Sequence, residues 1–424
     1  MSVVTTPIPE GAVLLHVGLP KTGTTALQNA AARRRRALLE HGVLYPGTHH
    51  NHSWASFAVA RRRRGWGSGP NKAAVPPISH WEDLVAEVRA AETRRVLVSH
   101  EYFAEHSATV CERVVRDLDR DVHVVFTMRN QSSLLSSTWQ EYLKNGITLD
   151  FPQWLEAVLG SDEDPEQFRA FAKRTALSDS VAKWARIVGP ERVTVAVLDK
   201  DNPSLLTETF ESLLDVPRGL LGDVELSGAR ANRSMTAPEA ELVRSMNADL
   251  RGHEDVSWDL FRGLYRLGAI TSMLSEREPA PDEPRILPPR WAAEAAAARA
   301  RGHVEAIAGL GVTVVGRLDD LAAVGPSIPE PEPTPDAVPV QAAREATLGT
   351  FWSAAKRIGA LEEQIAALSA AARPPVPATD GTVRSHVRAG LVATEGIASR
   401  ALVLALLGRV AVRTKRLLRR GRRA

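Results

Sequence analysis

The sequence predicts an α/β protein, a three-layer sandwich with a central, mainly parallel sheet and a helical C-terminal extension. Short apolar runs of β type alternate with stretches of helical periodicity, which is the pattern of a parallel sheet covered by helices. A glycine-containing turn joins the first apolar run to the first helical stretch. The chain has 424 residues, 44% of them hydrophobic and 24% charged, which is enough for one large core with additional segments.

The first strand is expected at residues 12–17, a short apolar run that stops at a glycine. Further strands of the same type are expected at residues 43–45, 95–99, 122–127 and 193–198. The hydrophobic periodicity predicts helices at residues 24–39, 81–91, 109–118, 134–143, 180–188 and 205–214. Beyond residue 247 the sequence predicts helices, including the alanine-rich run 291–300.

The main domain is expected to cover residues 11–324. Residues 325–341 contain six prolines and three acids, a composition that favours an extended linker over a packed core. A short coiled-coil-like helix is expected at residues 342–371. Apolar residues there repeat every seven positions, at Phe351, Ile358 and Ile365, and again three positions later, at Ala354, Leu361 and Leu368. Such a helix permits a homodimer. A second linker is expected at residues 372–381, and a basic amphipathic tail at residues 382–424.

Charge is concentrated at the C-terminal end of the chain. From residue 384 onward there are eleven Lys and Arg against one acid, Glu395, so the rest of the chain is mildly acidic although the formal net charge is +3. Apolar residues of the tail fall on one helical side and basic residues follow them, which suits an anionic membrane surface. The apolar stretch 401–407 is far shorter than the ~20 residues that cross a bilayer. No nucleic-acid partner is expected, because the basic excess lies outside the main domain.

The first ten residues contain neither a basic start nor an apolar run, so no secretory signal is expected. Cys111 is the single cysteine, which excludes an internal disulfide and multi-cysteine metal sites. These features predict a cytoplasmic protein, with the tail as a peripheral contact to the inner face of the cell membrane.

An anion-binding loop is predicted at residues 16–25, where the first strand ends and the first helix begins. Backbone N–H groups at a helix start are unpaired and bind anions. Two glycines, Gly18 and Gly23, let the backbone approach a ligand, and hydroxyl or ammonium donors surround them: Lys21, Thr22, Thr24 and Thr25.

The lysine position separates this loop from an ATP-binding one. A loop of that kind reads G-x-x-x-x-G-K-[ST], with lysine after the second glycine. Here Lys21 precedes Gly23, and no strand ends in a well-placed magnesium-binding aspartate. A P-loop-type fold is therefore expected, built for a 5′-phosphate without a metal-bound triphosphate.

Residues 20–25, Pro-Lys-Thr-Gly-Thr-Thr, resemble the 5′-phosphosulfate loop of sulfotransferases of bacterial type that use 3′-phosphoadenosine 5′-phosphosulfate (PAPS). That family carries an arginine at a strand end and a serine eight residues later, which bind the donor's 3′-phosphate. Arg129 and Ser137 resemble this pair, and a guanidinium can hold phosphate through two hydrogen bonds. The chain departs from the family at Gln131, where proline is usual.

Residues 232–234, Asn-Arg-Ser, resemble a segment of bacterial sulfotransferases that closes over the donor's 3′-phosphate. Arg233 and Ser234 are therefore candidate donor ligands, and a simple helix-entry loop is the alternative. In all, the resemblance covers roughly residues 13–247.

The acceptor side requires a general base, which in this family is histidine or glutamate. Loops at the carboxyl ends of strands are where open α/β sheets place their sites. Residues 45–54, with Tyr-Pro and three histidines, resemble the acceptor-side region of bacterial homologues, and His50 is the first candidate for the base. Glu101, after the strand 95–99, is the second.

The other acceptor-side candidates are His49, His52 and Arg64. Three histidines in four positions are also compatible with a zinc site or with a polar loop that has no role. Arg64 belongs to the basic run 61–64, which either attracts an acidic acceptor or is simply a solvated surface.

The resemblance implies direct in-line transfer of a sulfuryl group from PAPS to a hydroxyl or amine of a small-molecule, glycan or lipid-linked acceptor. The product nucleotide is 3′-phosphoadenosine 5′-phosphate (PAP), Lys21 neutralises the departing phosphate, and no metal is required. Two other functions are weighed. A P-loop kinase or NTPase is opposed by the displaced lysine and by the Arg129 and Ser137 pair. A catalytically inactive membrane-surface protein is suggested by the basic tail.

Overall fold

The computed structural model describes residues 5–66, 72–160, 175–199, 201–222, 233–330, 335 and 337–371. The chain divides into two compact units, Met1–Ile358 and Gly359–Ala424, and the second is described only at residues 359–371. The expected linker 372–381 and the basic tail 382–424 lie outside the described residues.

The described part of the first unit contains one sheet of six parallel strands in the order β2-β3-β1-β4-β5-β6, which confirms the predicted α/β class. Val13 of β1 pairs with Val96 of β3 on one side and Val122 of β4 on the other. The strand bounds are β1 Val13–Gly18, β2 Val43–Leu44, β3 Arg95–Ser99, β4 Val122–Met128, β5 Val193–Val197 and β6 Thr313–Val315. The last strand was not predicted; it lies at the edge of the sheet, and two of its three residues are exposed.

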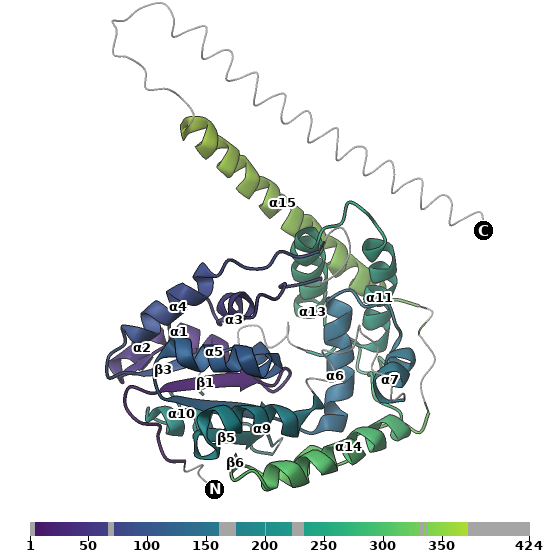
Figure 1. The fold of residues 1–424 in the computed structure, drawn as a ribbon. Coiled ribbons are helices and arrows are strands. Elements are labelled where there is room, and N and C mark those ends of the chain that lie inside the picture. The colour runs from purple at the N-terminus through teal and green to yellow at the C-terminus, as the bar shows by residue number, and fades with distance from the viewer. Residues whose placement is uncertain are drawn as a thin grey trace, which may run out of the picture. The chain divides into compact units, whose positions relative to one another are not determined.

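Helices cover both faces of the sheet (Figure 1). Side chains alternate across a strand, so Val13 and Leu15 of β1 pack in one core and Leu14 in another. The first core contains residues of α3 Ser53–Val59, α4 Ser79–Arg89, α5 Ala108–Leu118 and α9 Leu177–Val188. The second contains residues of α1 Thr24–Arg33, α2 Arg35–Glu40 and α10 Leu205–Leu214. The predicted helix 24–39 is thus two helices, because the backbone of Arg34 leaves helical geometry.

A third core lies among helices on the right of Figure 1. It contains residues of α6 Gln131–Lys144, α7 Phe151–Leu159, α11 Ala237–Arg251, α12 Trp258–Leu260, the π-helix η5 Phe261–Ile270, α13 Thr271–Glu276, α14 Arg290–Ala308 and α15 Val340–Ala371. Three short 3₁₀ helices are also present: η1 Glu101–Glu105, η3 Pro190–Arg192 and η6 Leu318–Ala322. None of the described helices is long and apolar enough to cross a membrane.

The first compact unit extends to Ile358, beyond residue 324 where the sequence analysis ended the main domain. Two contacts explain the difference. Ile328, in the proline-rich segment, forms a bridge with Pro289, and Ala342 of α15 is fully buried in the third core. In the second unit, α15 continues to Ala371 and exposes Leu361, Ile365 and Leu368. The heptad-based homodimer stays a prediction.

Candidate active site

The loop between β1 and α1 is shaped for a close approach by a ligand. Gly18 and Gly23 have φ angles of 91° and 76°, which glycine adopts without steric cost. Gly18 also lies against Glu101, because a Cβ added at Gly18 would be 2.6 Å from the Glu101 Cβ. Gly23 is the N-cap of α1, and since it has no side chain to cap the helix, the first N–H groups of α1 face the loop.

The three threonines of this loop differ in their exposure to solvent. Thr22 is fully buried, and its hydroxyl donates to the Leu19 carbonyl at 2.5 Å. The hydroxyl expected to face the donor therefore points into the protein, and Thr22 offers a ligand only its backbone. Thr24 is buried at the first position of α1, whereas Thr25 is exposed.

A buried chain of hydrogen bonds runs beneath the loop. Its ends fix its direction, because the Gln28 amide can only donate to the Ser99 hydroxyl (3.1 Å) and the Leu19 carbonyl can only accept. The Ser99 hydroxyl then donates to Nδ1 of His16 (2.8 Å), and Nε2–H of His16 donates to the Thr127 hydroxyl (3.1 Å). Thr127 in turn donates to Thr22 at 2.6 Å.

This chain of hydrogen bonds requires a neutral His16, and burial lowers the pKa of His16 to about 3. It joins the carboxyl ends of β1, β3 and β4 to the loop. Asn51, on the acceptor side, extends it by donating to the Gln28 carbonyl oxygen at 3.0 Å. One network therefore connects the donor loop with the acceptor-side segment.

Arg129 and Ser137 line the same cavity, which has a volume of about 650 Å³. Arg129 follows β4 directly, and its Nη1 donates to the Lys21 carbonyl at 3.2 Å, so the arginine lies next to the loop. Burial lowers the pKa of Arg129. Gln131, which stands where the family has proline, donates from its side chain to the Arg129 carbonyl at 2.8 Å and so secures the turn in another way.

Arg233 and Ser234 line the same cavity. The Arg233 guanidinium is already held by Glu239, with both oxygens at 2.7 Å, and it also donates to backbone carbonyls of α13. Glu239 further pairs with Arg277 at 2.6 Å. Arg233 therefore fastens the entry of α11 to α13, while Ser234 is exposed.

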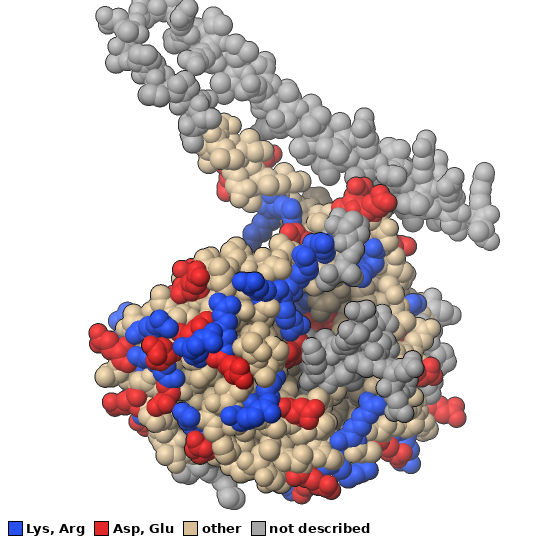
Figure 2. Space-filling view, in the orientation of Figure 1, with Lys and Arg blue, Asp and Glu red and all other residues tan. Residues whose placement is uncertain are grey.

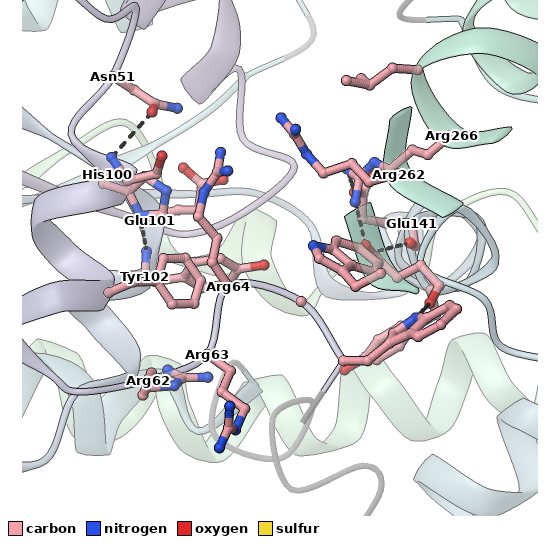
Figure 3. Close-up of a pocket in the computed structure, with 18 of the residues that line it drawn as sticks. Asn51, Arg62, Arg63, Arg64, His100, Glu101, Tyr102, Glu141, Arg262 and Arg266 are labelled. Carbon is pink, nitrogen blue, oxygen red and sulfur yellow. Dashed lines mark hydrogen bonds and ion pairs between the residues drawn. The ribbon is translucent and has the colours of Figure 1, made fainter. Parts of the chain in front are cut away.

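A second cavity, of about 440 Å³, contains the two candidates for the base, His50 and Glu101 (Figure 3). The Glu101 carboxylate accepts from Gln28 at 3.4 Å. Burial opposes its ionisation, but His100 and hydrogen bonds outweigh burial, so the pKa of Glu101 is lowered. Partial desolvation at the cavity wall, together with Arg64, lowers the pKa of His50, so this imidazole is neutral at pH 7 although part of it remains open to solvent. Both groups are in the form that accepts a proton.

Glu141 of α6 links the loop to this second cavity. Its carboxylate pairs with Lys21 at 3.1 Å and with Arg266 of the π-helix at 2.7 Å. Burial disfavours the charged form, but Lys21 and Arg266 outweigh it, and the pKa of Glu141 is strongly lowered. Sequence reasoning missed Glu141, although it lies one helical turn after Ser137 on a helix that already carried a candidate.

The remaining acceptor-side candidates separate. Arg64 lines the second cavity, with its guanidinium 4.4 Å from the centre of the Trp54 ring. His52 is buried, and its ring nitrogens bond the Ser99 N–H (2.9 Å) and the Pro46 carbonyl (3.1 Å). His49 is exposed, and its carbonyl accepts from Arg35. In the described part of the chain, no three His, Cys, Asp or Glu side chains are grouped as metal ligands would be.

No family model and no curated protein matches the sequence. Among solved structures, a sulfotransferase from Alicyclobacillus acidocaldarius is similar to part of the chain, with a TM-score of 0.36 and 16% identity. The match covers 58% of this chain and 94% of that one. A similarity at this level carries no argument about activity, so any function must be argued from the residues of the two cavities.

Proposed function

We propose that the protein is a PAPS-dependent sulfotransferase that transfers a sulfuryl group to a hydroxyl or amine. The observation that carries the proposal is the contact between Arg129 and the Lys21 carbonyl at 3.2 Å. It brings the strand-to-helix loop beside an arginine that lines a cavity of about 650 Å³, a volume suited to a nucleotide. Two anion sites this close fit a nucleotide with phosphates at both the 3′ and 5′ positions.

In this proposal the loop N–H groups and Lys21 bind the 5′-phosphosulfate, and Arg129 with Ser137 binds the 3′-phosphate. Lys21 also lies beside Glu141, which lines the acceptor-side cavity. The lysine therefore stands between the two cavities, where the transferred group would pass.

The transfer itself is a single displacement at sulfur. The acceptor oxygen or nitrogen forms a bond to sulfur while the bond from sulfur to the 5′-phosphate oxygen breaks, and PAP leaves with that electron pair. Lys21 stabilises the charge that develops on the departing phosphate. The acceptor's proton goes to the base, for which His50 and Glu101 are the two candidates.

Donor binding is tested by calorimetric titration of the full-length protein with PAP and, separately, with magnesium-ATP. We expect metal-independent binding of PAP that Lys21→Ala and Arg129→Ala weaken. Arg290→Ala is the matched control, because Arg290 is exposed on α14 outside both cavities. A preference for magnesium-ATP, or no binding of PAP, would instead favour a kinase-like function.

The base is identified by comparing His50→Gln and Glu101→Gln in single-turnover assays with PAPS and an acceptor found by screening. Removal of a general base lowers the rate by about 10²- to 10⁴-fold. We expect one variant to show this loss with unchanged PAP affinity. If neither rate falls tenfold, both assignments are wrong.

A further inference from the structure

The acceptor-side cavity has a strong excess of positive charge. Its ionised side chains are two glutamates, Glu101 and Glu141, and five arginines, Arg62, Arg63, Arg64, Arg262 and Arg266. Figure 2 shows Lys and Arg side chains gathered beside the hollowed part of this face. An excess of this size in a concave site favours a negatively charged ligand.

Three of these arginines already have partners. They are Arg62 with Glu105 (3.1 Å), Arg63 with the Ala73 carbonyl (2.6 Å) and Arg266 with Glu141 (2.7 Å). Arg64 and Arg262 differ, because no carboxylate of the described residues lies within 4.0 Å of either guanidinium. Figure 3 shows them reaching the cavity from opposite sides.

These two arginines form no close ion pair with a described carboxylate, and their positive charges are near enough to repel each other. Burial lowers the pKa of Arg64, and the charges of Arg262 and Arg266 lower it further. Burial and Arg266 also lower the pKa of Arg262, and the charge of Asp259 offsets only part of that effect. Half-buried charges of one sign are costly without a counter-charge, so an anion between them would remove that cost.

The backbone that presents Arg262 and Arg266 is unusual. Phe261–Ile270 is a π-helix of ten residues, a conformation that is rare, is mostly limited to single turns and is frequent at functional sites. Its other side is held closely: a Cβ added at Gly268 would be 2.9 Å from the Gly349 carbonyl of α15. The widened helix thus places two arginines and Leu267 in the cavity wall from a fixed support.

We propose that Arg64 and Arg262 bind an anionic group of the acceptor, a carboxylate, sulfate or phosphate, so that the substrates of this site are acidic molecules. That the bound molecule is the sulfuryl acceptor rests on the proposed function, whereas the binding of an anion by these two arginines does not. A guanidinium binds each of these groups through paired hydrogen bonds. Because His50 and Glu101 line the same cavity, an acceptor held by its acidic group would present its hydroxyl or amine beside them.

The test compares ligands that differ only in charge, by ligand-observed NMR titration of the full-length protein. The sugar set is glucose, glucuronic acid, glucose 6-sulfate and glucose 6-phosphate, and the aromatic set is 4-hydroxyphenylacetamide and 4-hydroxyphenylacetate. We expect an anionic member to bind at least tenfold more tightly than its neutral counterpart, and the best one identifies the source of the anion. If no charged ligand exceeds its neutral partner, the proposal is overturned.

Arg64→Gln and Arg262→Gln should each weaken the anionic ligand by about tenfold or more, the usual effect of losing a charged hydrogen-bond donor. Arg290→Gln removes the same charge outside the cavity and should leave affinity unchanged. The Tm of Arg262→Gln should stay the same or rise, because the substitution relieves repulsion. A fall of several degrees would assign Arg262 a structural role and overturn the proposal.

A parallel titration with PAP separates this proposal from the sulfotransferase assignment. Anion binding that depends on Arg64 and Arg262, in a protein that does not bind PAP, would refute the proposed function and leave the anion site standing. PAP binding without any preference for anionic ligands would refute the anion site and leave the proposed function standing.

Discussion

Replacement of His16 by leucine tests the buried hydrogen-bond chain beneath the loop. The substitution keeps similar bulk but removes two hydrogen bonds, to Ser99 (2.8 Å) and Thr127 (3.1 Å), worth about 1 kcal/mol each. Both hydroxyls are fully buried and lose one of their partners, which adds to the cost. The edge contact of the imidazole with Phe210, at 5.0 Å between ring centres, adds about 0.5 kcal/mol or more. The free energy of unfolding should therefore fall by about 3 kcal/mol.

The assay is urea unfolding at pH 7.5, with His123→Leu as the matched control. His123 lies on β4, the strand next to the one that carries His16, and it too bonds a threonine hydroxyl, that of Thr194 at 2.8 Å, but it is half-buried and makes one such bond. The control should lose about 1 kcal/mol. PAP affinity should fall only for His16→Leu, because His16 belongs to the hydrogen-bond chain that orients Thr22 and His123 does not. A loss below 1 kcal/mol for His16→Leu, or one no larger than the control's, would refute the assigned chain.

Three further predictions concern stability. Glu239→Gln should lower the free energy of unfolding by about 3–5 kcal/mol in urea titrations, because it leaves Arg233 without a carboxylate partner among the described residues and Arg277 with Glu283 alone; a loss under 1 kcal/mol would contradict this. Gly18→Ala should lower the Tm, since it combines a φ of 91° with a Cβ 2.6 Å from that of Glu101, at a cost of about 1–3 kcal/mol; an unchanged Tm would show that the loop yields freely. Acid should destabilise the fold through three buried histidines whose pKa is lowered: His16 (about 3), His52 (about 4) and His106 (about 3). Above pH 6.5 their imidazoles are neutral in the folded and the unfolded protein, whereas below pH 6.5 only the unfolded protein gains protons, so the free energy of unfolding falls by about 1.4 kcal/mol per pH unit for each histidine until its folded pKa is reached. Equal stability at pH 7.5 and 5.5 would rule this out.

The parts of the site that sequence predicted are those encoded within one short segment. The loop of residues 18–25 is contiguous, and Arg129 and Ser137 are joined by the end of one strand and the start of one helix. In such segments the order of residues determines which groups face the same space. The five predicted strands were recognisable for the same reason, since each lies in a short apolar run of the sequence.

Other features depend on residues far apart in the chain. The buried Thr22 hydroxyl accepts a hydrogen bond from Thr127, which lies 105 positions away. Arg262 and Arg266 were not predicted as site residues because nothing in the sequence shows that residues 261–270 lie across a cavity from Arg64, which is far away in the chain. The first compact unit continues through the predicted linker to Ile358, because proline content describes a segment's own flexibility, not the surface on which the next helix packs.

Helix α6 contributes to both cavities. Ser133 and Ser137 line the nucleotide-sized cavity, and Glu141 and Asn145, at the end of the same helix, line the other. With a rise of 1.5 Å per residue, the eight positions from Ser137 to Asn145 correspond to about 12 Å. Helix α6 therefore fixes the distance between these parts of the two cavities. One residue inserted between Ser137 and Glu141 would turn the helix beyond it by about 100°, so the two sets of side chains would no longer face their two cavities together. Under the proposed function, we expect changes of acceptor among related chains to arise in the π-helix and in the loop that carries Arg64, while the length of α6 stays constant.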